Sequence, residues 1–221
     1  MQSTPPCDQP RPIAPLRFDP GSRSRSLLKL FAVTLLAMIS VNAAAKDITW
    51  TGATNNTWDI VTSNWKLTVG GTATTYAIGD TVTFDDSASN GPTISINMGS
   101  GAAPGSVTMN NNNFTYTFTN AAISGAGSFT MNGSGTVQFN VANSYGGGTF
   151  LKNGTLRNGV TNGVPLNSTL TMGNLTNTTT FVLSVGVGQQ LGNIVIAPGA
   201  TAADNTVTST CLLYTSPSPR D

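Results

Sequence analysis

The most regular feature of the sequence is an alternation of apolar and polar residues that begins at residue 81. In Thr81–Phe84 and Thr93–Met98, every second residue is apolar, and the residues between are Thr, Ser or Asn. The alternation recurs at the apolar sets Val107/Met109, Phe114/Tyr116/Phe118, Phe129/Met131, Val137/Phe139/Val141, Leu170/Met172 and Ile194/Ile196. Because successive side chains of a strand point to opposite faces, each run predicts a half-buried strand. No helical period appears after residue 45, so the pattern predicts an all-β fold.

Asn, Gly and Pro separate these runs, for example at Asn132-Gly133 and Asn153-Gly154. Two architectures fit this punctuation. An Asn-Gly pair between alternating runs is typical of a two-residue hairpin, which favours an antiparallel β-sandwich. Short uncharged strands rich in Thr and Asn also fit a parallel β-helix with three strands per coil, in which like residues stack and hydrogen-bond from coil to coil. With roughly 20–25 residues per coil, residues 81–210 would form about half a dozen coils.

Residues 46–80 differ from the repeated region because they contain all three tryptophans of the chain, Trp50, Trp58 and Trp65. An aromatic cluster at the start of a solenoid covers the first coil, whose edge would otherwise recruit other strands. We therefore predict an N-terminal cap over residues 46–80. The alternative is a carbohydrate-binding surface, because flat aromatic rings stack on the faces of sugars.

Residues 1–45 have the three parts of a secretory signal peptide, here with an extended n-region. These parts are the basic residues Arg23, Arg25 and Lys29, an apolar core of 12 residues at Leu30–Val41, and the small residues Ala43–Ala45. The sequence thus predicts that residues 22–45 engage the export machinery and that Lys46 is the first mature residue. A signal anchor is the alternative, although a transmembrane helix needs about 20 apolar residues. The long segment before residue 22 indicates an extended signal or a start codon assigned too far upstream.

Charge is sparse in residues 46–210, which contain four basic and six acidic residues. A protein that binds nucleic acid needs clustered Lys and Arg to displace counterions from phosphates. The basic residues here are scattered at Lys46, Lys66, Lys152 and Arg157. Nucleic acid is therefore excluded as an expected partner.

The composition also restricts catalysis, because the chain has no His and no Glu, and its two cysteines are Cys7 and Cys211. Ser-His-Asp and Cys-His catalysis and zinc sites are thereby excluded in residues 46–210. Asp85 and Asp86 are adjacent, but neighbouring strand residues point to opposite faces and do not converge on one substrate. Together with Asp80 they form the one candidate calcium site. We favour the alternative, in which these residues belong to a solvated turn. We predict no enzymatic activity, no cofactor and no metal.

The segment Ala122–Gly159 resembles the autotransporter-associated β-strand repeat, a passenger repeat of bacterial surface proteins. Its most specific parts are Asn143–Thr149 (NSYGGGT) and Asn153–Leu156 (NGTL), and Pro165–Thr171 resembles the segment that follows such repeats. Gly146 and Phe150 depart from the pattern, since Thr is usual at both positions. The opening segments around Trp50 and Thr81–Asp86 are also similar to segments that precede these repeats. The resemblance implies a right-handed β-helix outside the cell, and it implies no catalytic residues.

The candidate site residues form a structural turn motif: Tyr145, Gly146, Gly147, Gly148, Asn153 and Gly154. Tyr145 is expected to cover the apolar interior at a coil corner. The three glycines allow a tight turn or close contact with the adjacent coil. Asn153-Gly154 supplies a positive φ at the next corner.

Residues 211–221 break the pattern and are interpreted as a non-native tail, with the gene continuing past residue 210. The open end is then expected to self-associate. We predict the N-terminal fragment of an exported β-helical passenger, at the outer-membrane surface or extracellular, with a structural or adhesive role toward host or environmental surfaces or polysaccharide. The alternatives are a secreted carbohydrate-binding module that uses the tryptophans and a β-helical polysaccharide-degrading enzyme.

Overall fold

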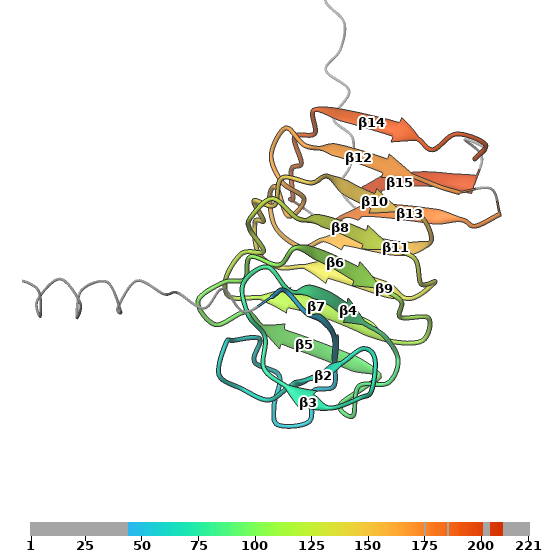
Figure 1. Ribbon diagram of the computed structural model, residues 1–221. Coiled ribbons are helices and arrows are strands. Elements are labelled where there is room, and N and C mark those ends of the chain that lie inside the picture. The colour runs from blue at the N-terminus through green and yellow to red at the C-terminus, as the bar shows by residue number, and fades with distance from the viewer. Residues whose placement is uncertain (1–43, 175, 185, 201–203, 210–221) are drawn as a thin grey trace, which may run out of the picture. The chain divides into compact units, whose positions relative to one another are not determined.

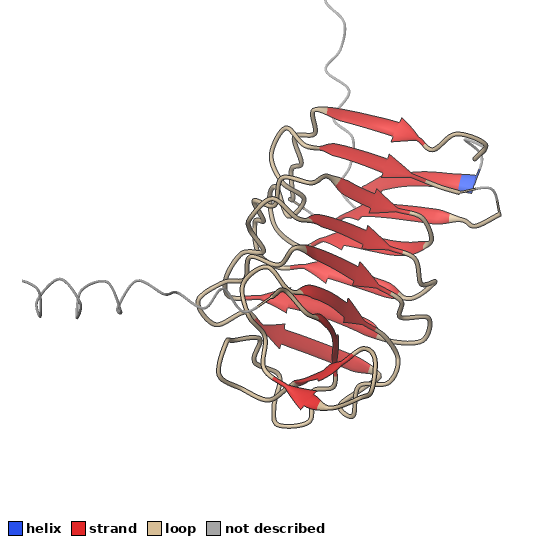
Figure 2. Cartoon of the chain, in the orientation of Figure 1, coloured by secondary structure: helices blue, strands red, loops and turns tan. Residues whose placement is uncertain are grey.

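The structure, a computed structural model, describes residues 44–174, 176–184, 186–200 and 204–209. The expected signal peptide, except Ala44 and Ala45, and the expected tail lie outside these residues. The described residues contain fifteen strands, which form two sheets (Figures 1 and 2). Within the same residues, no helix has the length and apolar character needed to cross a membrane.

The first sheet has nine strands in the order β14-β12-β10-β8-β6-β4-β1-β2-β3. Their bounds are β1 Asp47–Trp50, β2 Trp65–Leu67, β3 Ala73–Thr74, β4 Thr81–Phe84, β6 Ser106–Met109, β8 Ser128–Met131, β10 Thr149–Leu151, β12 Thr169–Met172 and β14 Asn193–Ile196. The second sheet has six strands in the order β15-β13-β11-β9-β7-β5. Their bounds are β5 Thr93–Asn97, β7 Thr115–Thr119, β9 Thr136–Phe139, β11 Gly154–Asn158, β13 Thr179–Leu183 and β15 Asn205–Ser209.

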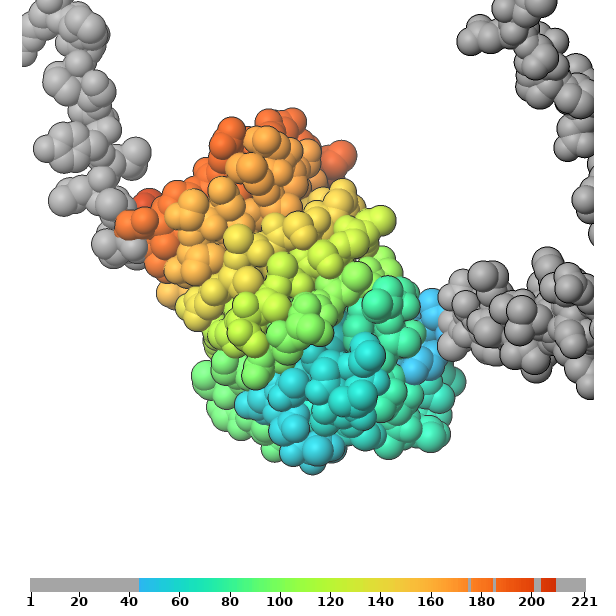
Figure 3. Space-filling model, turned by 90° about the vertical axis from the view of Figure 1, so that its left-hand side faces the viewer, coloured from blue at the N-terminus to red at the C-terminus, as the bar shows by residue number. Residues whose placement is uncertain are grey.

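From β4 onward, the chain alternates between the two sheets, and its described residues wind a parallel β-helix of six coils. The first strands of successive coils begin 20 to 25 residues apart, and each strand pairs in parallel with the equivalent strand of the next coil. The colour bands in Figure 3 follow this stacking from the cap to the last coil. The predicted all-β parallel solenoid is confirmed.

The antiparallel sandwich is wrong, and the position of the Asn-Gly pairs explains why. Asn132-Gly133 lies between β8 and β9, and Asn153-Gly154 lies at the passage from β10 to β11, so both pairs turn the chain from one sheet to the other. At Gly154 the φ angle is 72°, and an added Cβ atom would lie 2.6 Å from the carbonyl oxygen of Gly133 in the preceding coil. The positive φ that favours Asn-Gly in hairpins is used here at a coil corner.

Each coil has two strands rather than the three that we expected. The remaining side of the coil, which we call the third side, comprises residues 98–105, 120–127, 140–148, 159–168 and 186–192. Its only bridge between coils in the described residues joins Ala102 to Ile123. Because this side is rich in Ala, Gly and Ser and lacks the two-residue alternation, it stacks through single backbone hydrogen bonds such as Ser144 N to Ile123 O (2.9 Å).

The core consists of columns of inward-facing side chains that stack from coil to coil. One column in the first sheet runs through Phe84, Met109, Met131, Leu151, Met172 and Ile196. In the second sheet, a column runs through Ile94, Tyr116, Val137, Leu156, Phe181 and Val207. The outer face of the second sheet carries a parallel column of threonines: Thr93, Thr115, Thr136, Thr155, Thr180 and Thr206. The predicted alternation thus separates a dry interior from a hydroxyl-covered surface.

The cap, residues 46–80, closes the N-terminal end of the first sheet. Strand β1 pairs in parallel with β4 and antiparallel with β2, and β2 pairs antiparallel with β3. Asn64 is buried and organises the loop before β2, because its Oδ1 accepts hydrogen bonds from the backbone N–H groups of Thr54 and Asn55 (2.9 and 3.0 Å). This loop places Trp58 beneath the first coil, where its ring lies 5.5 Å from that of Phe84.

Candidate functional site

The three tryptophans of the cap form a closed aromatic cluster. Their side chains are at most 1% exposed. The rings of Trp50 and Trp65 meet edge to face, with centroids 5.0 Å apart, and Trp58 packs in the same way on Tyr76 at 5.3 Å. None of the three indole nitrogens has a hydrogen-bond partner among the described residues.

The tryptophans therefore do not offer the open ring faces that the carbohydrate-binding alternative requires. A sugar stacks on a ring face that solvent can reach, and these faces are covered by other aromatic rings. The tryptophans pack as the core of the cap, which was the interpretation favoured from the sequence.

Asp85 and Asp86 lie at the corner between β4 and β5 and make separate contacts. Both carboxylate oxygens of Asp86 accept hydrogen bonds from the next corner of the coil stack, including the backbone N–H groups of Asn112, Asn113 and Phe114 at 3.0–3.2 Å. Partial burial raises the pKa of Asp86, but these hydrogen bonds outweigh it, so that the pKa lies below its usual value. Asp86 is a clamp between the first and second coils.

The remaining carboxylates of the candidate calcium site point elsewhere. The Oδ1 atom of Asp85 accepts the N–H of Ser87 at 2.8 Å, and its backbone carbonyl accepts the hydroxyl of the buried Tyr116 at 2.6 Å. Asp80 is buried in the cap beside Lys46. The structure does not bring Asp80, Asp85 and Asp86 together, and the described residues contain no group of three metal-ligating side chains.

The turn motif lies on the third side and at the corner that follows β10. Tyr145 is 2% exposed, its ring stacks on Phe129 at 6.0 Å, and its hydroxyl pairs with Oγ1 of Thr149 at 2.8 Å. Burial raises the pKa of Tyr145 well above its usual value, so that the phenol stays neutral. At Gly147, an added Cβ atom would lie 2.7 Å from the backbone of Gly127 in the preceding coil. These residues hold adjacent coils close together.

Two hollows on the third side were not predicted from the sequence. The first, of about 400 Å³, lies where the cap meets the first two coils and is lined by Ile60, Tyr76, Ile78, Ser100, Gly101, Ala102, Ala103, Ala122 and Ser124. Ile60 and Ile78 are 62% and 76% exposed. This hollow has no charged lining residue, so it suits an apolar or weakly polar group.

The second hollow, of about 390 Å³, lies on the two coils that contain the turn motif. Its lining is Asn143–Gly146 and Pro165–Ser168, which combines amides and hydroxyls with the half-exposed Leu166. Such a lining suits a hydroxyl-rich ligand. The sequence signal that points to both hollows is the lack of alternation on the third side, but the signal does not show which segments meet.

Comparisons of the chain with protein-family models, with curated proteins and with solved structures find no match. The resemblance to autotransporter-associated repeats therefore stays a hypothesis.

Proposed function

We propose that this protein is an exported β-helical passenger, displayed at the cell surface, that serves as a structural element and attaches to environmental or host surfaces, including polysaccharide, through its third side. The observation that carries the proposal is that its buried polar groups bind the coils to one another. Asn143 is 5% exposed and spans three coils, because its Oδ1 accepts the N–H of Ile123 (2.9 Å) and its Nδ2 donates to Gly163 O (2.7 Å).

Another buried amide and one partly exposed carboxylate have the same use. Nδ2 of Asn111, a fully buried residue, donates to the carbonyl oxygens of Phe114 and Thr136, which belong to two successive coils. Asp86 clamps the first coil to the second. Hydrogen bonds that satisfy buried polar groups favour a unique and rigid arrangement. Rigidity along a stack of coils is what a surface-displayed support requires.

Export is supported by the leader pattern and by the composition of the rest of the chain. The apolar core at Leu30–Val41 followed by Ala43–Ala45 matches the requirements of a secretory signal. Residues 46–210 contain no cysteine, so no disulfide has to form within them during or after export. Both features belong to the sequence and not to the fold.

The test of display is to express the full chain with its leader in a bacterium and to treat intact cells with a protease. We expect the protein to be exported and degraded by the external protease, while a cytoplasmic marker stays intact. A version with Leu35→Arg, which interrupts the apolar core, is expected to remain inside the cell. Recovery of the unchanged protein in the cytoplasm would contradict export.

The test of attachment uses the first hollow. Beads coated with purified protein are expected to bind immobilised host or environmental material that presents apolar or weakly polar groups, with little dependence on salt because charge is sparse. The double variant Ile60→Asp and Ile78→Asp is expected to bind at least severalfold more weakly. Val69→Asp is the matched control, because Val69 is 86% exposed on the cap and does not line the hollow. Equal loss of binding in the control would argue against the hollow as the contact site.

A further inference from the structure

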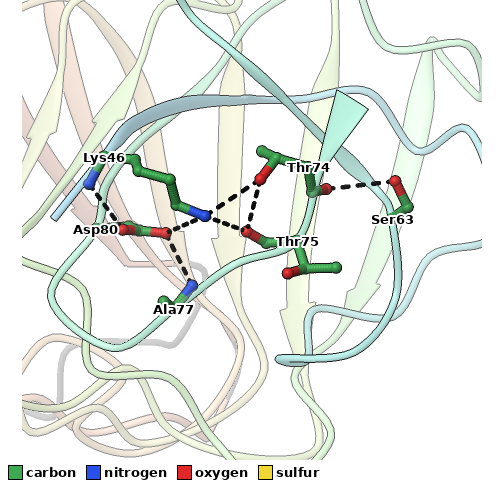
Figure 4. Close-up of polar contacts among 6 residues, drawn as sticks. All are labelled: Lys46, Ser63, Thr74, Thr75, Ala77 and Asp80. Atoms are coloured by element: carbon green, nitrogen blue, oxygen red, sulfur yellow. Dashed lines mark hydrogen bonds and ion pairs between the residues drawn. The ribbon is translucent and has the colours of Figure 1, made fainter. Parts of the chain in front are cut away.

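Lys46 meets a buried carboxylate at the point where the chain enters the fold. Its backbone nitrogen donates to Oδ1 of Asp80 at 2.8 Å, and its side-chain Nζ lies 3.6 Å from Oδ2 of the same residue (Figure 4). The Asp80 side chain is 1% exposed, and its Oδ2 also accepts the N–H of Ala77 at 2.8 Å. Nζ of Lys46 donates in addition to the carbonyl oxygen of Thr75 at 2.8 Å.

Lys46 is also the boundary between the exposed leader end and the sheet. Its carbonyl oxygen accepts the N–H of Thr81 at 2.8 Å, and parallel pairing with β4 begins at the next residue, Asp47. Ala44 and Ala45, which precede it, are exposed. The peptide bond between Ala45 and Lys46 thus joins an accessible segment to an anchored one.

We propose that hydrolysis of the Ala45–Lys46 bond by a signal peptidase creates an α-ammonium group at Lys46, and that Asp80 is the receiving carboxylate of this new N-terminus. The inference depends on the proposed export. Water adds across the bond: the C–N bond breaks, the water oxygen stays on Ala45, which leaves as a carboxylate, and the Lys46 nitrogen keeps its one amide hydrogen and gains both hydrogens of the water, so that it becomes an ammonium group at neutral pH. The neutral amide that donates to Asp80 becomes a cation, and the same nitrogen and oxygen atoms form an ion pair.

The surroundings of Asp80 explain why this exchange stabilises the cap. A buried carboxylate is costly unless it is paired and hydrogen-bonded. Before cleavage, its one cationic partner among the described residues is Nζ of Lys46. Cleavage supplies a second cation, the α-ammonium group of Lys46. Because Lys46 directly precedes β1 and Asp80 is the last residue of the cap, the ion pair joins these two segments. Processing therefore fastens the N-terminus to the segment that leads into β4.

The other titratable groups around this N-terminus are few. Burial, and then the negative charge of Asp80, raise the pKa of Tyr76 to about 12, so its phenol is neutral at physiological pH. The side chain of Asp47, the next residue, is exposed to solvent. A free α-amino group has a pKa of about 7.7–8.0, and pairing with a carboxylate raises it. The stabilisation is therefore fully present below about pH 7.7 and is lost as the pH rises through the raised pKa of the α-ammonium group.

The experiment compares the processed protein with two variants after export from the full-length precursor. Mass spectrometry of the N-terminus is expected to begin at Lys46. The melting temperature is then followed from pH 6 to pH 10. The unchanged protein is expected to lose several degrees as the pH rises, whereas Asp80→Asn is expected to melt lower at pH 7 and to show little of this loss. Lys46→Gln removes the ε-ammonium group but keeps the α-ammonium group, so the pH-dependent loss should remain.

A second readout does not depend on melting. An amine-acylating reagent at neutral pH is expected to modify the α-amino group roughly tenfold more slowly in the unchanged protein than in Asp80→Asn. The exposed side chain of Lys152 serves as the internal reference for reagent activity. An N-terminus other than Lys46, or equal acylation rates in the two proteins, would overturn the proposed ion pair while leaving export intact. A chain that keeps its leader would instead defeat the proposed export.

Discussion

The two ends of the coil stack differ in how completely they bury the apolar columns of the core. At the N-terminal end, Trp50 and Phe84 lie in the first sheet and are fully buried. In the last coil, Ile194, Ile196 and Val207 are 46%, 37% and 49% exposed, although they continue the columns of the coils before them. Burial in a solenoid is therefore a property of having a neighbour on both sides, not of the alternation itself.

The cap provides the missing neighbour at one end by changing the residue type and the strand direction. Aromatic rings replace aliphatic side chains, and the antiparallel strands β2 and β3 replace a further parallel coil. Large rings fill the space under the first coil, and the antiparallel turn ends the sheet. The following predictions test whether this difference between the ends has the expected energetic consequences.

The largest effect is expected for Trp58→Ala in the cap. Trp58 contacts the rings of Trp65, Tyr76 and Phe84, and no large group is available to fill the cavity after truncation. The free energy of unfolding is expected to fall by about 3–5 kcal/mol. Denaturant titration followed by circular dichroism measures the change. Val69→Ala, at an exposed position of the same cap, is the control and should have almost no effect. A loss below about 1 kcal/mol for Trp58→Ala would show that the cap is not part of the cooperative core.

A matched pair of truncations in one column compares an inner coil with the last one. Leu170 and Ile194 are partners in the register of β12 and β14, but Leu170 is fully buried and Ile194 is 46% exposed. Leu170→Ala is expected to cost about 2–5 kcal/mol, and Ile194→Ala about half of that or less. The same denaturant titrations measure both. Equal costs would mean that Ile194 is covered in solution.

The coil architecture was accessible from the sequence because it depends on local patterns that repeat. The alternation predicted the strands, and a β-helix with roughly 20–25 residues per coil predicted about half a dozen coils. The expected hydrogen bonds between like side chains of successive coils are present at two corners: Nδ2 of Asn132 donates to Oδ1 of Asn110 at 3.3 Å, and Nδ2 of Asn120 donates to Oδ1 of Asn97 at 3.0 Å. Stacking in register makes these pairs inevitable once the coil length is known.

The contacts that define the candidate sites were not accessible, because they join segments without any local pattern. Ile60 and Ile78 meet the third side across the boundary of the cap. Lys46 and Asp80 are separated by 34 residues. The third strand of each coil was wrongly expected for a related reason. The small residues of the third side carry neither a strand pattern nor a helical one, so only the packing of the coils determines their path.

The edge that β14 and β15 leave exposed predicts association of a chain that ends at residue 221. Strands β14 and β15 present exposed apolar side chains at the end of both sheets, and exposed strand edges recruit further strands. Light scattering after size-exclusion chromatography is expected to show reversible oligomers of this purified chain. The double variant Ile194→Lys and Val207→Lys is expected to be monomeric, whereas Val69→Lys, at the cap, should associate like the unchanged protein. A monomer at high concentration for the unchanged protein would contradict this prediction.

The smallest effect is expected at Asp86, the carboxylate clamp of the first coil. Because the pKa of Asp86 is lowered in the folded state, its contribution to stability is present above the unfolded pKa of about 3.9 and is lost as the pH falls through the folded value. Asp86→Asn keeps an acceptor oxygen but removes the charge. We expect the difference in melting temperature between pH 7 and pH 3 to shrink by a few degrees in this variant.

The later corners provide the reference for this last prediction. There, amides such as Asn110 and Asn132 pair with one another and do not titrate, so acid should weaken the N-terminal end of the stack more than its middle. Asp59 must be separated from this effect. Burial raises the pKa of Asp59, but hydrogen bonds from Thr62 and Val61 outweigh burial, so that the pKa lies below its usual value. Asp59→Asn therefore removes a second acid-dependent contribution to stability, which lies in the cap. Hydrogen exchange at pH 3 and pH 7 distinguishes the contribution of Asp86 from that of Asp59. Unchanged protection at the corner of Asn112–Phe114 in acid would show that the carboxylate charge of Asp86 is not needed there.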